Sequence, residues 1–399
     1  MRALRIALIA AALCAAAVPG FCSGIDNKTN WSAGYARTMN RNAVYDAPDA
    51  AVYNPAGIGM MGNGLYASLN NQSLFPDYSH ESAAETYAAK NPTLFLPSAF
   101  VVYKRDMLGF YGAFYVPAGG GSLEYEDGIV DLNETLGLAA ASPSADLFGV
   151  YYAGTAGAVV SYKKMISLSA GVRYVYATQK QNFMRALPTP TVLLKTKATS
   201  SGIGGIFGVD VRAVERLNVG VRYETNTKLE WEYKDVAGPL AGGLGIAKGD
   251  KFDRDLPAVL AIGASYMVLP KLKVEGSLDY YFQKSADWDG DEDDVDNGFA
   301  VGAVAEYKPL EKLKVSAGFL YTKTGADPDS YVYLNPALDS FTIAGRTIYR
   351  FTDNLSAELG IIKPFYFGDD GLSAVPPAAP VQLDKSLWIV ALGVQYKIF

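Results

Sequence analysis

Apolar and polar residues alternate along most of the chain, and four alternating segments begin alike. Segments 271–276 and 312–317 start Lys-Leu-Lys-Val, 216–221 starts Arg-Leu-Asn-Val and 354–359 starts Asn-Leu-Ser-Ala, each after a tight polar or proline-containing turn. Alternation with a period of two indicates a β-strand whose two faces meet different surroundings. The segment after residue 271 is typical, because one face carries Leu272, Val274, Gly276, Leu278, Tyr280 and Phe282.

The alternating segments are long, and the connections between them alternate in length. They run for about 10 to 14 residues with aromatic residues near their ends, which is typical of membrane-spanning strands and longer than strands of soluble sandwiches. Short turns at one end and long loops at the other are typical of outer-membrane barrels. The sequence predicts an all-β fold, a 14-stranded antiparallel transmembrane β-barrel, with strands near 64–78, 93–104, 107–117, 147–162, 166–182, 200–213, 217–234, 256–269, 272–284, 297–308, 313–324, 338–351, 354–367 and 384–399.

The start of the chain has the pattern of a secretory signal. Arg2 and Arg5 precede a short alanine-rich apolar run, and small residues end at Gly24. We therefore predict a cleaved signal peptide at 1–24, which would leave no cysteine in the exported chain. No later stretch reaches the ~18 consecutive apolar residues of a transmembrane helix.

Composition narrows the class further. Half of the residues are hydrophobic, and the chain has 27 Tyr and 40 Gly, which suits apolar residues spread over alternating strands. The formal net charge of −6 argues against a nucleic-acid partner. These features predict a multi-pass barrel in the bacterial outer membrane.

A barrel of 14 strands leaves a lumen that the segment before the first strand can fill. Eight strands enclose a space that side chains fill and sixteen leave an aqueous channel, so 14 strands need a plug or stay open. Segment 25–63 lacks alternation and has too much apolar surface for a solvated tail, although a disordered tail is the alternative. Its apolar residues are Trp31, Tyr35, Met39, Val44, Tyr45, Val52, Tyr53, Ile58, Met60 and Met61.

Part of this segment resembles a known family. Residues 32–39 read Ser-Ala-Gly-Tyr-Ala-Arg-Thr-Met, and Asp-Ala-Ala-Val-Tyr at 49–53 is followed by Asn-Pro-Ala-Gly. This pattern resembles the N-terminal hatch of the FadL/TodX outer-membrane transport family, and Arg41-Asn42 departs from a stretch that is Gly-rich in many members. The resemblance implies a hatch at 25–63 and a barrel at 64–399, with the hatch motif at Asn54, Pro55, Ala56 and Gly57.

The resemblance also implies a function. The family takes up hydrophobic compounds, above all long-chain fatty acids and in some members aromatic hydrocarbons. Its members capture the ligand at an apolar extracellular groove, pass it to the lumen and release it through a hatch change and a lateral opening. We expect a hydrophobic ligand, surrounding lipid and lipopolysaccharide, the outer-membrane assembly machinery acting on a strand that ends at Phe399, a monomer, and no cofactor or metal.

Two apolar loops are candidates for the capture groove. Residues 235–250 are unusually apolar for an exposed loop, and 183–194 add further large side chains. The alternative is that these loops pack on each other as a cap. The candidate capture residues are Phe183, Leu187, Leu193, Leu240, Leu244 and Ile246.

Two arginines are candidates for binding a ligand carboxylate. Arg173 and Arg222 fall on the polar phase of their strands, which faces the lumen. A cation in a water-poor lumen favours a carboxylate. The alternative is that both pair with lumen acids such as Glu224.

The third strand contains residues that disturb a ladder. Pro117 lacks an N–H donor, and Gly119, Gly120 and Gly121 favour a kink. A kink there would provide a lateral opening. The alternative is that the strand simply ends at these residues.

Other classes remain open. The acidic loop 287–296 lacks the order of a calcium loop, so a solvated face, a cation site and divalent bridging to lipopolysaccharide are all considered. His80, the only histidine, has no serine motif beside it, so we expect a surface residue and no acyl-hydrolase activity. A general diffusion porin and a structural or adhesive barrel are the remaining alternatives.

Overall fold

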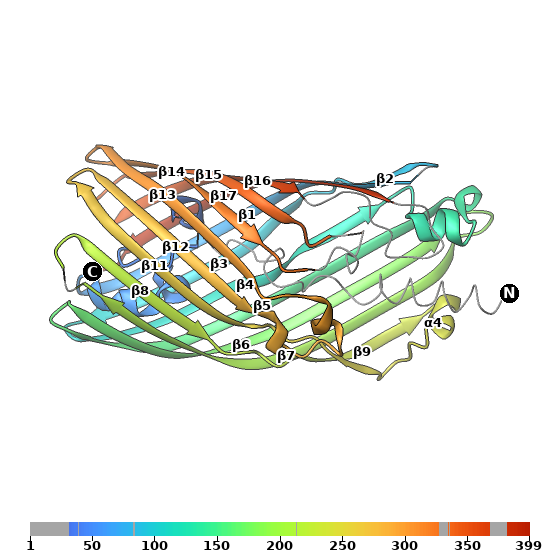
Figure 1. Ribbon diagram of the computed structural model, residues 1–399, viewed down its shortest axis with the longest axis horizontal. Helices are drawn as coiled ribbons and strands as arrows, with labels where there is room; N and C mark the ends of the chain where they lie inside the picture. The colour runs from blue at the N-terminus through green and yellow to red at the C-terminus, as the bar shows by residue number, and fades with distance from the viewer. Residues whose placement is uncertain are drawn as a thin grey trace.

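A computed structural model describes residues 32–38, 40–82, 84–212, 214–326, 334, 336–367 and 381–399. The predicted signal peptide and most of the long connection at 368–382 lie outside this part of the chain. All described strands belong to one antiparallel sheet (Figure 1). β1 pairs with β3 on one side and with β17 on the other, where Tyr66 lies opposite Lys397, so the sheet closes on itself.

The strand order follows the chain. The 17 described strands form a barrel wall of 14 spanning strands. β8 and β9 form one spanning strand after a short interruption, as do β10 and β11, and β2 is a short hairpin strand beside β1. The strands are β1 (Gly64–Glu81), β2 (Thr86–Ala89), β3 (Thr93–Arg105), β4 (Leu108–Tyr125), β5 (Pro143–Tyr162), β6 (Ile166–Arg185), β7 (Thr191–Val211), β8 (Leu217–Glu224), β9 (Glu230–Ala237), β10 (Lys251–Asp253), β11 (Ala258–Leu269), β12 (Leu272–Phe282), β13 (Gly298–Leu310), β14 (Leu313–Lys323), β15 (Asp339–Arg350), β16 (Leu355–Phe367) and β17 (Gln382–Lys397).

The helical elements are short. No helix in the described ranges is long and apolar enough to cross a membrane. They are α2 (Tyr35–Thr38), α3 (Ala50–Tyr53), the 3-10 turn η2 (Pro55–Met60), the π turn η3 (Asp131–Thr135), η4 (Ala139–Ala141), α4 (Pro239–Gly243), η5 (Gln283–Ser285) and η6 (Asp291–Asp294).

The predicted barrel of 14 strands is confirmed, but two strands extend into predicted loops. β4 runs to Tyr125 and β7 begins at Thr191. The reason is that the apolar residues of these strands switch from the outward-facing to the inward-facing positions along the strand. On β6, Tyr176 is exposed on the outside, whereas seven residues later the buried Phe183 points inward. A search for one continuous apolar face therefore ends the strand too early.

The outer surface is apolar over its middle portion. Leu168, Val172 and Ile203 point outward and are 56%, 61% and 70% exposed. On β17 the outward phase includes Trp388 and Tyr396, as the alternation predicted. So large an exposed apolar band is expected of a wall in contact with lipid.

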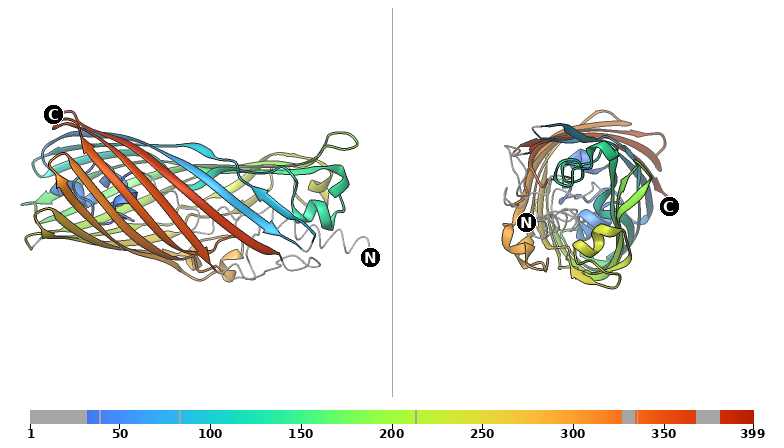
Figure 2. Two further views of the ribbon diagram at one scale, coloured as in Figure 1. Left: turned by 90° about the horizontal axis from the view of Figure 1, so that it is seen from above. Right: turned by 90° about the vertical axis from the view of Figure 1, so that its right-hand side faces the viewer.

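The N-terminal segment lies inside the ring of strands, as both views in Figure 2 show for the blue helical turns. α2 lies against β12–β16, whereas α3 and η2 lie against β3–β8, so the segment crosses the lumen. Gly220 and Gly263 are cross-strand partners on the inner face. A Cβ on Gly263 would lie 2.6 Å from the backbone nitrogen of Ala43, so these glycines admit the chain at 42–43.

Replacing Gly263 by Val should displace residues 42–43 from the wall and open the lumen. We expect a larger steady conductance in planar bilayers and greater sensitivity of the cells to vancomycin. The matched control is Gly276→Val, since Gly276 faces outward and a Cβ there has only ordinary contacts, the nearest at 3.9 Å. Equal conductance of the two variants, both confirmed as folded by heat-modifiable gel mobility, would contradict the close-approach argument.

Candidate functional site

The Asn-Pro-Ala-Gly motif joins the N-terminal segment to the wall. Asn54 Nδ2 donates to Asp210 Oδ2 on β7 at 2.6 Å and to the Val44 carbonyl at 3.0 Å. The hydroxyl of Ser167 on β6 donates to the carbonyl of Ala56. The motif therefore contacts two neighbouring strands through side-chain hydrogen bonds, and its other members, Pro55 and Gly57, are buried in η2.

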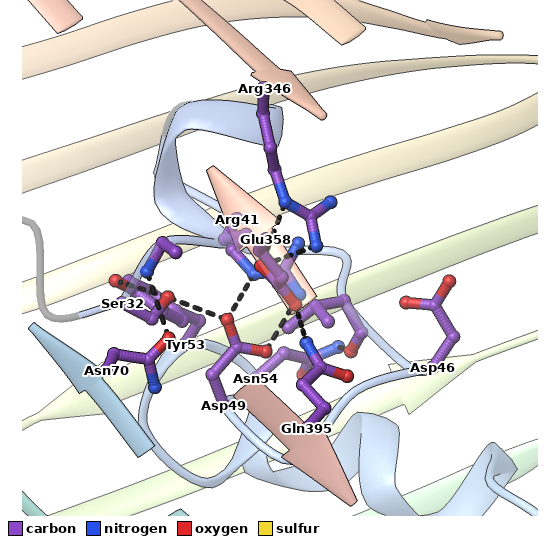
Figure 3. A network of polar contacts seen from close by, with 12 residues as sticks. Ser32, Arg41, Asp46, Asp49, Tyr53, Asn54, Asn70, Arg346, Glu358 and Gln395 are labelled. Carbon is purple, nitrogen blue, oxygen red and sulfur yellow. Dashed lines mark hydrogen bonds and ion pairs between the residues drawn. The ribbon is translucent and has the colours of Figure 1, made fainter. Parts of the chain in front are cut away.

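A buried ion pair holds the two halves of the segment together. Arg41 donates to both carboxylate oxygens of Asp49 at 2.7 Å, and the Ser32 hydroxyl donates to the same carboxylate at 2.7 Å. Arg41 is 0% exposed and Asp49 is 2% exposed. Figure 3 shows this pair beside the wall residues Arg346 and Glu358. A bidentate pair of this kind joins residues that are eight positions apart in a fixed arrangement.

The neighbours of Arg41 reach the opposite side of the barrel. Asn42 Nδ2 donates to Asp279 Oδ1 on β12 at 2.6 Å, and Asn40 Nδ2 donates to the Ala300 carbonyl on β13 at 3.3 Å. The Arg41-Asn42 dipeptide, where the sequence departs from the family pattern, thus supplies anchors of the segment. Sequence reasoning assigned no such role to these residues.

Arg173 and Arg222 both point into the lumen, as predicted, and both pair with Glu224. Arg173 also donates to Thr227 Oγ1 at 2.9 Å. The Nε of Arg222 lies 2.8 Å from Glu224, and its Nη1 donates to the Val52 carbonyl at 2.8 Å. Both arginines therefore pair with a lumen acid, which was the alternative considered from the sequence. Their role in binding a ligand stays a prediction.

Above the arginines, the lumen is lined by aromatic rings. Trp231 on β9 lies edge-on to Tyr151 at 5.6 Å and stacks on Phe252 at 5.9 Å between ring centroids. Tyr233 lies 5.3 Å from Phe252. Sequence reasoning missed this set, although Trp231 and Tyr233 alternate with charged residues in β9, a signal of aromatic side chains on the inward phase.

At the end with the long connections, apolar side chains pack into a cap. Of the predicted capture residues, Phe183, Leu193 and Leu244 are buried there, and Leu240 and Ile246 are half-buried against them. Leu187 is 52% exposed. Phe183 and Leu193 lie on the long strands β6 and β7 rather than in a loop, which corrects the boundaries of the predicted loop. These residues pack on each other as a cap, which was the alternative considered from the sequence. Their role in capturing a ligand stays a prediction.

Four side chains connect the cap to the lumen. Tyr78, Val236, Ile246 and Tyr366 pack against both the cap cluster and the apolar cluster of the lumen. The lumen cluster includes Trp231 and reaches the N-terminal segment. Apolar side chains therefore follow one another from the outer cap to the middle of the barrel.

β4 is kinked at the predicted glycines and continues beyond them. Its register against β5 shifts between Tyr115 and Ala118 and again between Gly119 and Gly121. The expectation that the strand ends at Pro117–Gly121 is wrong, because the shifts absorb these residues and the ladder resumes. Gly119 and Gly121 have positive φ angles of 79° and 106°, which only glycine adopts easily.

The kink interrupts the wall on its other side. β4 pairs with β3 from Leu108 to Phe114, and no further pair between these two strands is present among the described residues. Near this interruption the side chains of Leu96, Val116 and Val150 pack together, with Leu74 and Phe148 against them. Farther along, Asn91 joins the chain before β3 to β4 again, because its Nδ2 donates to the Ser122 carbonyl at 2.9 Å and its Oδ1 accepts the N–H of Glu124 at 2.8 Å.

The expectation that His80 is a surface residue is wrong. His80 is 0% exposed and lies between the rings of Tyr87 and Tyr125, with ring centroids 5.2 Å and 5.3 Å away. Its Nε2 accepts the N–H of Val130 at 3.4 Å. The cap buries it because β1 extends past the membrane band into the packed outer end, where the inward phase is apolar.

The acidic loop folds onto the connection between β10 and β11. Trp288 is buried, and its indole N–H donates to the Asp255 carbonyl at 2.9 Å. Carboxylate oxygens of Asp253, Asp287 and Asp289 gather within 4.8 Å of one another. Burial, together with Asp287 and Asp289, raises the pKa of Asp253 above its usual range. Exposed acidic groups gather without binding a metal in many proteins, and this group alone assigns no ligand.

Solved structures with this architecture are known. The chain resembles a Pseudomonas aeruginosa FadL homologue with a TM-score of 0.73 at 16% identity, over 94% of this chain and 100% of that one. It resembles the Ralstonia pickettii toluene transporter TbuX (TM-score 0.68, 15% identity, 94% and 100% covered) and the Pseudomonas putida toluene transporter TodX (0.68, 12%, 92% and 99%). The chain has the fold of the FadL/TodX outer-membrane transporters. At these identities the likeness establishes the fold, and the resemblance inferred from the sequence is confirmed at that level.

Comparisons by sequence find no counterpart. No protein-family model and no curated protein sequence matches the chain. The FadL/TodX fold is an outer-membrane barrel, which agrees with the apolar outer surface. The transport of toluene is a property of TbuX and TodX, and for this chain it can only be proposed.

The Arg41–Asp49 pair should hold the N-terminal segment in place. Replacing Asp49 by Ala leaves the Arg41 charge buried without its carboxylate, which typically costs about 3–5 kcal/mol. We expect faster hydrogen–deuterium exchange in residues 32–61 and unchanged exchange in β12–β16. The control Asp77→Ala removes an exposed pair with Lys90, which is worth only about 0–1 kcal/mol. Unchanged protection of 32–61 in the Asp49 variant would contradict the anchoring role.

Proposed function

We propose that the chain takes up hydrophobic compounds across the outer membrane, with residues 25–63 as a hatch. A compound would enter through the apolar cap, pass along the aromatic side of the lumen and leave toward the lipid where β3 and β4 separate. The observation that carries this proposal is the unbroken succession of apolar side chains from the cap to Trp231 and the lumen cluster. The side chains that connect the two are Tyr78, Val236, Ile246 and Tyr366.

A route of this kind suits an apolar solute because each step replaces one apolar contact by another. Leaving an apolar site for water costs about 25 cal/mol per Å² of apolar surface, so an aqueous exit would be unfavourable. Leu74 packs against both the lumen cluster and the side chains between β3 and β4. The last step of the proposed route is therefore adjacent to lipid, at the lateral gate formed by Pro117, Gly119, Gly120 and Gly121.

The proposed hatch blocks the lumen below this gate. Its polar residues bond to β12 and β13 through Asn42 and Asn40, and its motif bonds to β6 and β7 through Asn54 and Ala56. A segment held on opposite walls leaves little room for the aqueous path of a general diffusion porin. Low conductance of the wild-type chain in planar bilayers would support the hatch, and a large steady conductance would favour a porin.

Charges in the lumen favour an uncharged ligand. Arg222, Ala261 and Asp279 lie in one row across β8, β11 and β12, so a carboxylate lies on the same inner level as the arginine. Arg173 and Arg222 also share Glu224. With cations and carboxylates matched at this level, the surrounding aromatic rings supply the remaining contacts. We infer that small uncharged hydrophobic molecules, including monoaromatics, suit the lumen best.

A long-chain fatty acid is the second candidate, and one observation favours it. Lys385 faces inward at the junction of the cap and the lumen, with its Nζ 4.8 Å from the ring centroid of Tyr366 and 5.3 Å from that of Tyr78. The same ammonium donates to the Pro336 carbonyl at 2.8 Å. A cation embedded in the apolar track is where a ligand carboxylate would be attracted while its chain enters the lumen.

Uptake of two probes should separate these ligand classes. In cells that lack their own transporters of hydrophobic compounds, we expect the chain to raise the initial uptake of radiolabelled toluene. Ile246→Ser should lower that rate about fivefold, from roughly 1 kcal/mol of lost apolar contact. The matched control is Ala247→Ser, next in sequence and exposed. Uptake of oleate that is lost in Lys385→Gln, without an effect on toluene, would favour a fatty acid instead.

The results also test the proposal itself. Toluene and oleate uptake equal to that of cells without the chain would contradict the transport function. Equal effects of the Ile246 and Ala247 variants would contradict the route through the cap, while transport itself would stand.

A reversible cross-link should test the exit between β3 and β4. Leu96→Cys with Val116→Cys places two thiols in the cluster that fills the interruption. We expect oxidation to abolish toluene uptake and a reductant to restore it. The control pair Ala99→Cys with Phe114→Cys bridges residues that are already partners in the ladder, so its oxidation should change nothing. Full uptake with the first pair oxidised would exclude this exit.

A further inference from the structure

The outer face of β6 and β7 changes from apolar to basic just above the membrane band. On β6 the outward residues are apolar from Ile166 to Tyr176. These ten steps, at about 3.3 Å each and a tilt near 45°, span ~23 Å, close to the ~25 Å apolar band of outer-membrane barrels. Tyr176 therefore marks the outer boundary of the band. The next two outward residues on this strand are Thr178 and Lys180.

Two lysines face each other at this level. Lys180 on β6 is the direct cross-strand partner of Lys197 on β7, and both are exposed. Like charges placed directly opposite each other destabilise an antiparallel pair. The Nζ of Lys180 lies over the ring of Phe148, 5.4 Å from its centroid. On its other side Lys197 lies opposite Asp235 of β9, whose carboxylate pairs with Lys195 at 3.4 Å.

Nearby lysines form ion pairs within the protein, whereas these two form none in the described part of the chain. Neither Lys180 nor Lys197 has a carboxylate within 4.0 Å in the described part of the chain. Three other exposed lysines of the same outer end each form an ion pair, Lys195 with Asp235 at 3.4 Å, Lys234 with Glu232 at 2.7 Å and Lys251 with Glu230 at 2.6 Å.

We propose that Lys180 and Lys197 together bind a phosphoryl group of a glycolipid headgroup in the outer leaflet. A phosphate monoester carries nearly two negative charges and three acceptor oxygens, so it matches two opposed ammonium groups. The pair lies about 9 Å above Tyr176 along the membrane normal, at the depth of headgroups. Long, flexible lysine side chains reach this layer without a change in the backbone.

The surface below the pair identifies the occupant as a lipid and not a soluble anion. Directly beneath Lys180 and Lys197 lie the cross-strand partners Thr178 and Thr199. The hydroxyl group of Thr178 is buried, and that of Thr199 suits a sugar. Below them follow the exposed Tyr176 and Ile203, which suit acyl chains. One amphiphile can contact all three layers at once, and inorganic phosphate can contact only the first.

The inferred site has a structural consequence that does not depend on what the barrel transports. The inward residues of the same stretch, Phe183 on β6 and Leu194 on β7, are partners in the ladder and are buried in the cap. A lipid headgroup that neutralises Lys180 and Lys197 would stabilise the part of the ladder that carries these two cap residues.

Native mass spectrometry of the purified full chain, with defined lipids, tests the site. The probes are diphosphorylated lipid A and the same lipid A without phosphates. We expect wild-type protein to retain the diphosphorylated form, and Lys180→Gln with Lys197→Gln to lower its affinity roughly 30-fold, from two lysines near a charged surface. The double variant Lys180→Arg with Lys197→Arg should retain binding. Both probes should bind the Gln variant with similar, weak affinity.

The matched control is Lys234→Gln with Lys251→Gln, which removes two exposed but ion-paired lysines from the same end of the barrel. This control should bind like the wild type. An equal loss in the control, an unchanged affinity in the Lys180 and Lys197 variant, or complete displacement of the lipid by millimolar inorganic phosphate would each overturn the proposal. Heat-modifiable gel mobility verifies that every variant is folded.

Discussion

The rest of this structure depends on one constraint, which is that hydrocarbon offers no partner for a backbone hydrogen bond. Strands that cross it must pair on both sides, so the sheet has to close, and β1 meets β17 for this reason. Closure of 14 strands then creates a lumen too wide for wall side chains alone to fill. The N-terminal segment occupies that lumen, and apolar side chains pack beside the interruption of the ladder between β3 and β4.

Within the wall, chemistry changes with depth. In the membrane band apolar residues face outward and the inward phase is polar, which supplies Asp210 and Asp279 as anchors for the N-terminal segment. Beyond the band the surroundings outside are aqueous, and the inward phase becomes apolar, as Phe183 and Leu194 show. The same strands thus provide polar partners for the N-terminal segment at one end and an apolar cap at the other.

The lumen also differs from side to side. α2 with its polar neighbours lies against β12–β16, whereas α3 and η2 lie against β3–β8, which contribute many of the aromatic and aliphatic side chains of the lumen cluster. Buried charges lie on both sides, since Arg346 pairs with Glu358 on the first side and Arg173 and Arg222 pair with Glu224 on the second. The route proposed for an apolar solute follows the second side, which is also the side of the β4 kink.

Alternation and turns were enough to predict a closed barrel of 14 strands, because the period of a strand and the need to close in lipid are local and general constraints. The motif at Asn54 could be recognised, but not its partner Asp210, which lies 156 positions away. The Arg41–Asp49 pair, the burial of His80, the aromatic wall around Trp231 and the opposition of Lys180 and Lys197 were decided only by the tertiary structure. They depend on which strand lies beside which, in what register, and on where each strand leaves the membrane, and these quantities are set by contacts between residues that are distant in the sequence.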